Sequence, residues 1–185
     1  MTRAELAHIL RAAAKIAGDP DILVIGSRSI LGSYPEHLLP EPVWMSMEAD
    51  IAFLDDPDAH KADLVDGAIG ELSSFHEMYT YYAQGVEVST ALLPDGWRDR
   101  VVPFVATSAE PASALCLDPH DLVVSKLAAM REKDRVFATE LVRAGLVSLE
   151  TLQSRTAVLS SATALQRRAV SDWLSSLAKR DRPRS

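Results

Sequence analysis

The sequence has almost none of the residues that build cross-linked or membrane-spanning proteins. Cys116 is the one cysteine among 185 residues, which excludes an internal disulfide framework and a cysteine-rich zinc site. Its apolar neighbours Leu115 and Leu117 indicate a buried thiol rather than a nucleophile. No apolar run approaches the roughly 18 residues of a membrane-spanning helix, and residues 1–19 carry charges where a secretory signal peptide is apolar. We therefore expect a soluble, cytoplasmic protein without a membrane partner.

Positive charge is also scarce. The 19 Lys and Arg residues are outnumbered by 26 Asp and Glu residues, and the net charge is −7. A protein that coats nucleic acid non-specifically needs a surplus of basic residues, so this balance argues against that class. A local basic patch near the C-terminal end is either a polyanion contact or a solvated terminus; it consists of Arg167, Arg168, Lys179, Arg180, Arg182 and Arg184.

Several common catalytic motifs are missing. The sequence contains no Gly-Lys-Ser/Thr phosphate loop, no dinucleotide-binding glycine pattern and no Gly-x-Ser-x-Gly elbow. The histidines do not form a pair at metal-ligand spacing; they are His8, His37, His60, His76 and His120.

Hydrophobic periodicity predicts an α+β half over residues 1–117, followed by a helical half over residues 118–185. The predicted elements are a helix over 3–17, a strand over 21–25, a surface excursion over 28–47 with one helical turn at 29–31, a strand over 48–54, a helix over 60–72, strands over 85–90 and 101–107 that can pair as a hairpin, and helices over 119–131, 132–144, 148–158 and 161–179.

Two acidic residues alternate on the second predicted strand. Successive side chains of a strand point to opposite faces, so Glu48 and Asp50 share a face with their Cα atoms about 7 Å apart. Carboxylate oxygens at this spacing can converge on one or two Mg²⁺ or Mn²⁺ ions. A half-exposed strand of an ordinary sheet has the same alternation, so the pair alone leaves both interpretations open.

The first predicted strand ends in Gly26 and Ser27. At such a corner the backbone N–H groups can approach a phosphate, the Ser27 hydroxyl can donate another hydrogen bond, and a following helix N-terminus favours negative charge. Arg28 either reaches the same phosphate or faces water.

Lys126 lies within the apolar stripe of the helix predicted over 119–131. On a helical wheel its neighbours include Leu122 and Met130. An ammonium group in an apolar stripe is costly to bury unless it extends to solvent or meets an anion. Lys126 is therefore a candidate ligand for a phosphate or for the acidic pair, with extension to solvent as the alternative.

Three charged residues follow Lys126. If the helix continues past Arg131, Lys133 and Asp134 fall near the face of Lys126. Arg131 lies farther round, and its pairing with Asp134 can also be an ordinary helix ion pair.

Taken together, these residues resemble the nucleotidyltransferase superfamily that includes DNA polymerase β and the aminoglycoside nucleotidyltransferases. The superfamily pattern is an apolar residue, Gly, then Gly or Ser, a spacer, and an acidic-apolar-acidic-apolar run. Ile25-Gly26-Ser27 and Glu48-Ala49-Asp50-Ile51 match it. The 20 residues of the spacer, 28–47, are more than is usual, which implies an insertion. The resemblance implies a small mixed sheet flanked by helices, with the helical C-terminal region packing on it and completing the site.

The second half is similar to toxin-type nucleotidyltransferases of abortive-infection and toxin–antitoxin systems. The similarity involves Lys126, Arg131, Lys133 and Asp134. The segments GSRSILGSYP, MEADI, LPDGWRDR and DLVVSKLAAMREKD are together similar to those of an uncharacterised bacterial nucleotidyltransferase-like family. The resemblance covers most of residues 20–145.

The resemblance implies an enzyme that transfers a nucleoside monophosphate from a nucleoside triphosphate to a hydroxyl acceptor. Glu48 and Asp50 would bind Mg²⁺ or Mn²⁺. The implied nucleotide-binding residues are Gly26, Ser27, Arg28, Lys126, Arg131 and Lys133, and the implied catalytic residues are Glu48, Asp50, Lys126 and Asp134.

The general base and the acceptor stay open at this point. Glu87 is the better candidate for a third carboxylate that activates the acceptor, and Asp99 is the second; in the toxin-type branch Asp134 can take part instead. The acceptor is a tRNA 3′ end, a protein or a small molecule, and a cognate antitoxin is an implied partner. One alternative is an inactive protein of this fold that binds a nucleotide or a protein partner. Another is an ordinary α+β domain in which the motifs are accidental.

Overall fold

The computed structural model describes residues 1–106 and 112–180 of the chain. Five strands form one mixed sheet in the order β3-β2-β1-β5-β4. β1 pairs antiparallel with β2 and parallel with β5, β2 pairs parallel with β3, and β4 pairs antiparallel with β5. The strands are β1 Ile22–Val24, β2 Glu48–Phe53, β3 Tyr82–Gly85, β4 Val102–Ala106 and β5 Ala112–Cys116. The expected small mixed sheet is confirmed.

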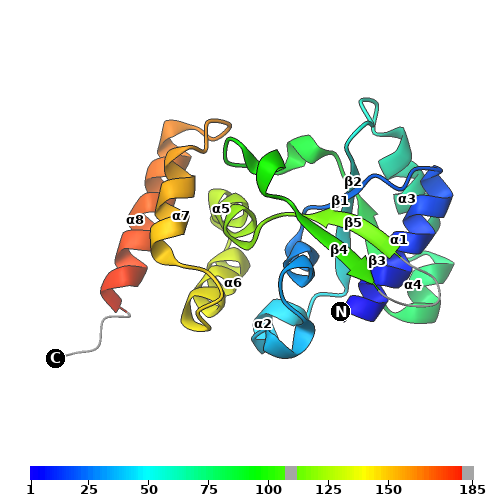
Figure 1. Cartoon of the computed structure of the whole chain (residues 1–185), viewed down its shortest axis with the longest axis horizontal. Coiled ribbons are helices and arrows are strands. Elements are labelled where there is room, and N and C mark those ends of the chain that lie inside the picture. The colour runs from blue at the N-terminus through cyan, green and yellow to red at the C-terminus, as the bar shows by residue number, and fades with distance from the viewer. Residues whose placement is uncertain (107–111, 181–185) are drawn as a thin grey trace.

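Helices lie against the sheet and extend beyond it, with α5 to α8 gathered on one side of the molecule (Figure 1). The first of them, α1, is specified locally, because Thr2 and Glu5 form a capping box at its start and Gly18 ends it in the left-handed conformation. The helices are α1 Arg3–Ala17, α2 Glu41–Trp44, α3 His60–Ile69, α4 Ser74–Tyr79, α5 Pro119–Ala129, α6 Glu132–Arg143, α7 Leu149–Ala157 and α8 Ala164–Arg180. The four C-terminal helices agree with the predicted ones within three residues.

The predicted hairpin of strands 85–90 and 101–107 is wrong. β3 and β4 lie at opposite edges of the sheet, and the antiparallel partner of β4 is β5. β3 also lies earlier than predicted, since residues 88–90 form a 3-10 turn. Residue 107 of the predicted strand lies outside the described residues.

The predicted helical turn at 29–31 is present but lies in the core rather than on the surface, whereas most of residues 33–47 are exposed or only partly buried, as predicted for a surface excursion. A 3-10 helix over Ser27–Gly32 places Ile30 and Leu31 in the core. Gly32 permits this close packing, because a Cβ atom there would lie 2.6 Å from the Cβ atom of Cys116. The first part of the spacer therefore packs against the sheet. Cys116 is itself fully buried, as predicted.

A buried charge cluster attaches the helical half to the rest of the chain. The Asp121 carboxylate of α5 accepts hydrogen bonds from Arg100 Nε at 2.8 Å and Arg100 Nη2 at 3.1 Å. Arg155 of α7 pairs with the same carboxylate at 3.2 Å. The cluster fixes α5 relative to both α7 and the 3-10 helix Trp97–Arg100. The division at residue 117 into two domains stays a prediction, since these contacts show only that the two parts are joined.

Within the described ranges 1–106 and 112–180, no helix is both long enough and apolar enough to cross a membrane.

Candidate functional site

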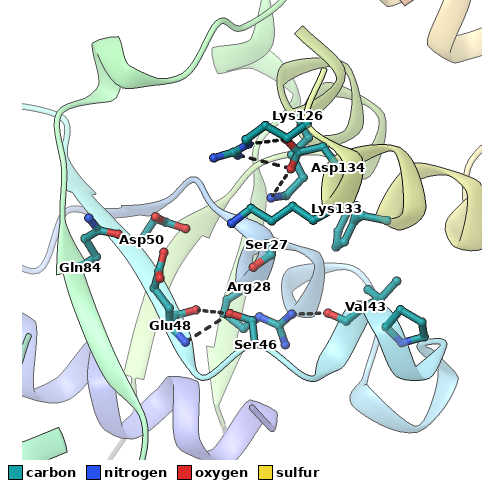
Figure 2. A pocket seen from close by; sticks show the side chains of 13 residues that line it. Ser27, Arg28, Val43, Ser46, Glu48, Asp50, Gln84, Lys126, Lys133 and Asp134 are labelled. Carbon is teal, nitrogen blue, oxygen red and sulfur yellow. Dashed lines mark hydrogen bonds and ion pairs between the residues drawn. The ribbon is translucent and has the colours of Figure 1, made fainter. Parts of the chain in front are cut away.

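A polar cavity of about 280 Å³ lies where the start of β2 faces α5 and α6 (Figure 2). Its wall is drawn from widely separated parts of the chain: Ser27, Arg28, Pro42, Val43, Ser46, Glu48, Asp50, Gln84, Lys126, Arg131, Lys133, Asp134 and Phe137. The structure thus brings both predicted carboxylates and all the predicted cations to one cavity.

The two carboxylates of β2 form the acidic side of the cavity. Tyr82 donates its hydroxyl hydrogen to Glu48 Oε2 at 3.1 Å, and this contact orients Glu48. Burial, together with the negative charge of Glu48, raises the pKa of Asp50 to about 6, although Lys126 acts in the opposite direction. The two carboxylates therefore repel each other, and a positive charge between them would relieve this repulsion.

Gly26 lies directly against Asp50. A Cβ atom at position 26 would fall 1.3 Å from Asp50 Oδ2, which means that only glycine leaves room for this carboxylate. The Gly-Ser corner thus creates the space into which Asp50 turns. Ser27, the next residue, lines the cavity with its side chain.

Lys126 and Arg131 form the basic side together with the buried acid Asp134. Lys126 Nζ lies 3.6 Å from Asp134 Oδ1 and 5.1 Å from the ring centre of Phe137. Arg131 donates from Nε to Asp134 Oδ2 at 2.6 Å and from Nη2 to Oδ1 at 3.4 Å. Burial lowers the pKa of Lys126, and the anions Asp134 and Asp50 partly offset that effect. Asp134 is only 1% exposed and holds both cations at the rim of the cavity.

Lys133 completes the basic side. Its side chain extends from α6 across the cavity toward Glu48 and Asp50 (Figure 2). Because Lys133 is exposed, its amine is accessible to a ligand that enters the cavity.

Arg28 is buried, so the alternative that it faces water is wrong. Its Nη1 donates to the carbonyl oxygen of Trp44 at 3.0 Å, and its Nη2 donates to that of Val43. Burial lowers the pKa of Arg28 to about 10. The side chain therefore holds the segment around α2 in place, and its contact with a phosphate stays a prediction.

The candidate third carboxylates are not in the cavity. Glu87 follows β3, accepts a hydrogen bond from Ser89 Oγ at 3.0 Å and lines a separate hollow beside Asp55 and Asp56. Asp99 lies on the exposed surface of the 3-10 helix Trp97–Arg100. Neither residue is positioned to act together with Glu48 and Asp50.

Gln84 lines the cavity and was not predicted from the sequence. It is the register partner of Asp50 across the parallel β2–β3 pair. Its amide lies beside the Asp50 carboxylate (Figure 2). The alternation of side chains in Tyr82-Ala83-Gln84 could have indicated that Gln84 shares a face with Tyr82. This inference requires a strand at Tyr82–Gly85, whereas the sequence predicts a strand at 85–90.

The residues of the cavity fit a magnesium-like cation that is shared with a ligand. No cluster of three or more His, Cys, Asp or Glu side chains able to hold a metal ion occurs in the described part of the chain. Mg²⁺ in phosphate-binding sites is commonly held by one or two carboxylates and completed by phosphate oxygens and water. Glu48 and Asp50 supply two such carboxylates, in a space that Gly26 keeps open for Asp50.

Comparison with known proteins found one family. A family model described as a nucleotidyltransferase of unknown function (DUF6036) matches residues 4–179, which include the sheet and nearly all of the four C-terminal helices. No curated protein and no solved structure matches the chain.

Proposed function

Because the chain belongs to this family of nucleotidyltransferases of unknown function and has the corresponding fold, we propose that it transfers a nucleoside monophosphate from a nucleoside triphosphate to a hydroxyl acceptor. The observation that carries the proposal is the single cavity lined by Glu48 and Asp50 on one side and by Lys126 and Lys133 on the other. Acids that suit a divalent cation and amines that suit phosphates face each other there.

The acidic side is the proposed cation site. Glu48 and Asp50 would hold Mg²⁺ or Mn²⁺ together with oxygens of the triphosphate. A bound divalent cation supplies Lewis-acid polarisation of phosphoryl oxygens and neutralises part of their negative charge. Gly26 contributes by leaving the space that the Asp50 carboxylate occupies.

The basic side is the proposed triphosphate site. Ser27 would donate from its hydroxyl group to a phosphate oxygen, and Arg131, Lys126 and Lys133 would neutralise the charge that grows on the departing pyrophosphate. Transfer of a nucleoside monophosphate depends mainly on positioning and on such electrostatic stabilisation.

We assign Asp134 a positioning role rather than the role of general base. Its carboxylate already accepts hydrogen bonds from Arg131 and pairs with Lys126, and it is almost fully buried. Both of its oxygens are engaged by these two cations, so neither is free to approach an acceptor hydroxyl. It would act by fixing Lys126 and Arg131 at the cavity.

The test is transfer of label from nucleoside triphosphates. Each of the four ribonucleoside triphosphates, labelled at the α-phosphorus, is incubated with the protein, Mg²⁺ and a cell lysate, and the RNA, protein and small-molecule fractions are counted. Label at the α-phosphorus should enter one fraction, label at the γ-phosphorus should not, and Asp50→Asn should abolish the transfer. No transfer into any fraction would contradict the proposal.

The same experiment identifies the acceptor. A tRNA 3′ end, a protein hydroxyl and a small-molecule hydroxyl each give label in a different fraction. The toxin-type role and a cognate antitoxin are part of the proposal through the resemblance of Lys126, Arg131, Lys133 and Asp134 to toxin-type enzymes.

A second candidate function is an inactive nucleotide-binding or protein-interaction module. The observation that favours it is the neutral Gln84 beside Asp50, where a carboxylate could have served as a base. For such a module, cation-dependent binding of a nucleoside triphosphate would be retained while no α-phosphorus label reached any acceptor.

A further inference from the structure

We infer that the cavity, before a nucleotide binds, holds one divalent cation rather than two, and that the neutral amide of Gln84 sets this number. The inference rests on the proposed function, since it concerns the same acidic site. In two-metal sites the cations lie about 3.5–4 Å apart and share bridging ligands. Such a pair brings four positive charges into one small volume, which anionic ligands must balance.

The negative charge of the carboxylates that are accessible from the cavity is enough to balance one divalent cation. Glu48 and Asp50 together carry two negative charges, which balance one divalent ion. One oxygen of Glu48 already accepts the hydrogen bond from Tyr82 at 3.1 Å. This leaves few carboxylate oxygens to bridge to a second ion.

The third acid at the cavity does not add to this set. Asp134 lies between Arg131 and Lys126, at 2.6 and 3.6 Å respectively, so its charge is already balanced. Lys133 also extends toward Glu48 and Asp50 (Figure 2). With Arg131 and Lys126 largely balanced by Asp134, the added positive charge of Lys133 beside Glu48 and Asp50 makes a second divalent ion electrostatically unfavourable.

Gln84 occupies the position from which a further carboxylate would complete a second site. It is paired with Asp50 in the β2–β3 register, and both side chains line the cavity. Glutamate has the same length and shape as glutamine but adds a negative charge. Gln84→Glu therefore changes the charge of the cavity without changing the size of the side chain. Because Gln84 is exposed, the added charge should not prevent the protein from folding.

The test counts bound Mn²⁺ by electron paramagnetic resonance, on the full chain without nucleotide. We expect the wild type to bind one magnetically isolated Mn²⁺ and Gln84→Glu to bind two that show spin–spin coupling. Gln84→Asn, the matched neutral control, should still bind one. Asp50→Asn should bind at least tenfold more weakly, and thermal melts check that all variants are folded.

Three results would overturn the inference: a coupled Mn²⁺ pair in the wild type, no bound Mn²⁺ in the wild type, or a Gln84→Glu protein that still binds a single ion. Failure of the proposed function gives a different pattern. One Mn²⁺ in the wild type and two in Gln84→Glu, with no transfer of α-phosphorus label, would refute the enzyme and leave the cation number standing.

Discussion

Gly26 and Asp50 are far apart in the sequence but in direct contact in the folded protein. A hydrogen atom on the Gly26 Cα atom leaves room for Asp50 Oδ2, whereas a methyl group would overlap it. The glycine of the Gly-Ser corner was expected to admit a phosphate, which stays a prediction, and in the structure it admits the Asp50 carboxylate. One small residue therefore shapes both the proposed phosphate site and the proposed cation site.

The first prediction concerns Gly26→Ala. The added Cβ atom should displace the Asp50 carboxylate, weaken Mn²⁺ binding at least tenfold and destabilise the protein by about 1–3 kcal/mol. Isothermal titration with Mn²⁺ and urea unfolding measure the two effects. Gly67→Ala in α3 is the control, because its Cβ atom meets nothing within 4 Å, and it should bind Mn²⁺ normally and be equally or more stable. Normal Mn²⁺ affinity in Gly26→Ala would contradict the contact.

The second prediction concerns the pH dependence of stability at Asp50, measured in EDTA. The pKa of Asp50 in the folded protein, about 6, lies above its ordinary value of 3.8. Its contribution to stability is therefore fully present below about pH 4 and is lost as the pH rises through about 6. Asp50→Asn cannot ionise, so it should gain on the order of 1–2 kcal/mol relative to the wild type between pH 4 and pH 8.

Urea unfolding at several pH values measures this gain. Glu77→Gln on the exposed side of α4 is the control and should show no comparable change. A wild type and an Asp50→Asn variant whose free energies of unfolding run parallel from pH 4 to pH 8 would show that Asp50 is an ordinary surface acid.

At the residue scale, the sequence identified the charged residues of the cavity but not all of their roles. Alternation on a strand predicted that Glu48 and Asp50 share a face, and a helical wheel predicted that Lys126 lies in an apolar stripe. Arg28 was harder, because its hydrogen bonds go to carbonyl groups that only the folded spacer brings near it. Gln84 was missed because its neutral side chain gives no charge signal in the sequence. Its place in the cavity follows only from its pairing with Asp50 in the sheet.

At the element scale, α5 connects the site to the rest of the molecule. The helix carries Lys126 in its last turn and Asp121 in its first turn. Asp121 is fully buried between Arg100 and Arg155, whereas Lys126 reaches the cavity. The orientation of Lys126 therefore depends on an ion-pair cluster at the other end of the same helix.

The third prediction concerns Asp121→Asn. Removal of this charge leaves two arginines without their buried anion, which should destabilise the protein by about 3 kcal/mol. Asp172→Asn is the control, because its pair with Arg168 is exposed on both sides and should contribute less than about 0.5 kcal/mol. Chemical denaturation measures both. Equal effects in the two variants would show that the cluster around Asp121 does not fasten α5.

Helices were easier to predict than strands. The apolar spacing of α1 and of the four C-terminal helices is a local property, and caps such as Thr2 and Gly18 mark the ends. β5 was missed because Ala112–Cys116 lacks the β-branched residues typical of strands. The false hairpin arose because neighbouring strands in the sequence were assumed to pair, although β2, β1 and β5 lie between β3 and β4 in the sheet.

At the scale of the whole molecule, the proposed site lies between the sheet and the helical half. β2 contributes the carboxylates, while α5 and α6 contribute the cations. The sequence predicted this meeting of distant segments through the family resemblance rather than through any local pattern. The packing of residues 28–32 at the start of the spacer could not have been predicted, because it depends on contacts with β5 and with the carbonyl groups of Val43 and Trp44.

Dependence of nucleotide binding on the divalent cation tests the proposed site most directly. Calorimetric titration with α,β-methylene-ATP, with and without Mn²⁺, should give at least tenfold tighter binding in the presence of the cation. Asp50→Asn should abolish this difference, whereas Lys133→Ala should weaken binding but retain it. Equal affinity of the wild type with and without Mn²⁺, or an Asp50→Asn variant that responds to Mn²⁺ as the wild type does, would contradict a shared site for cation and triphosphate.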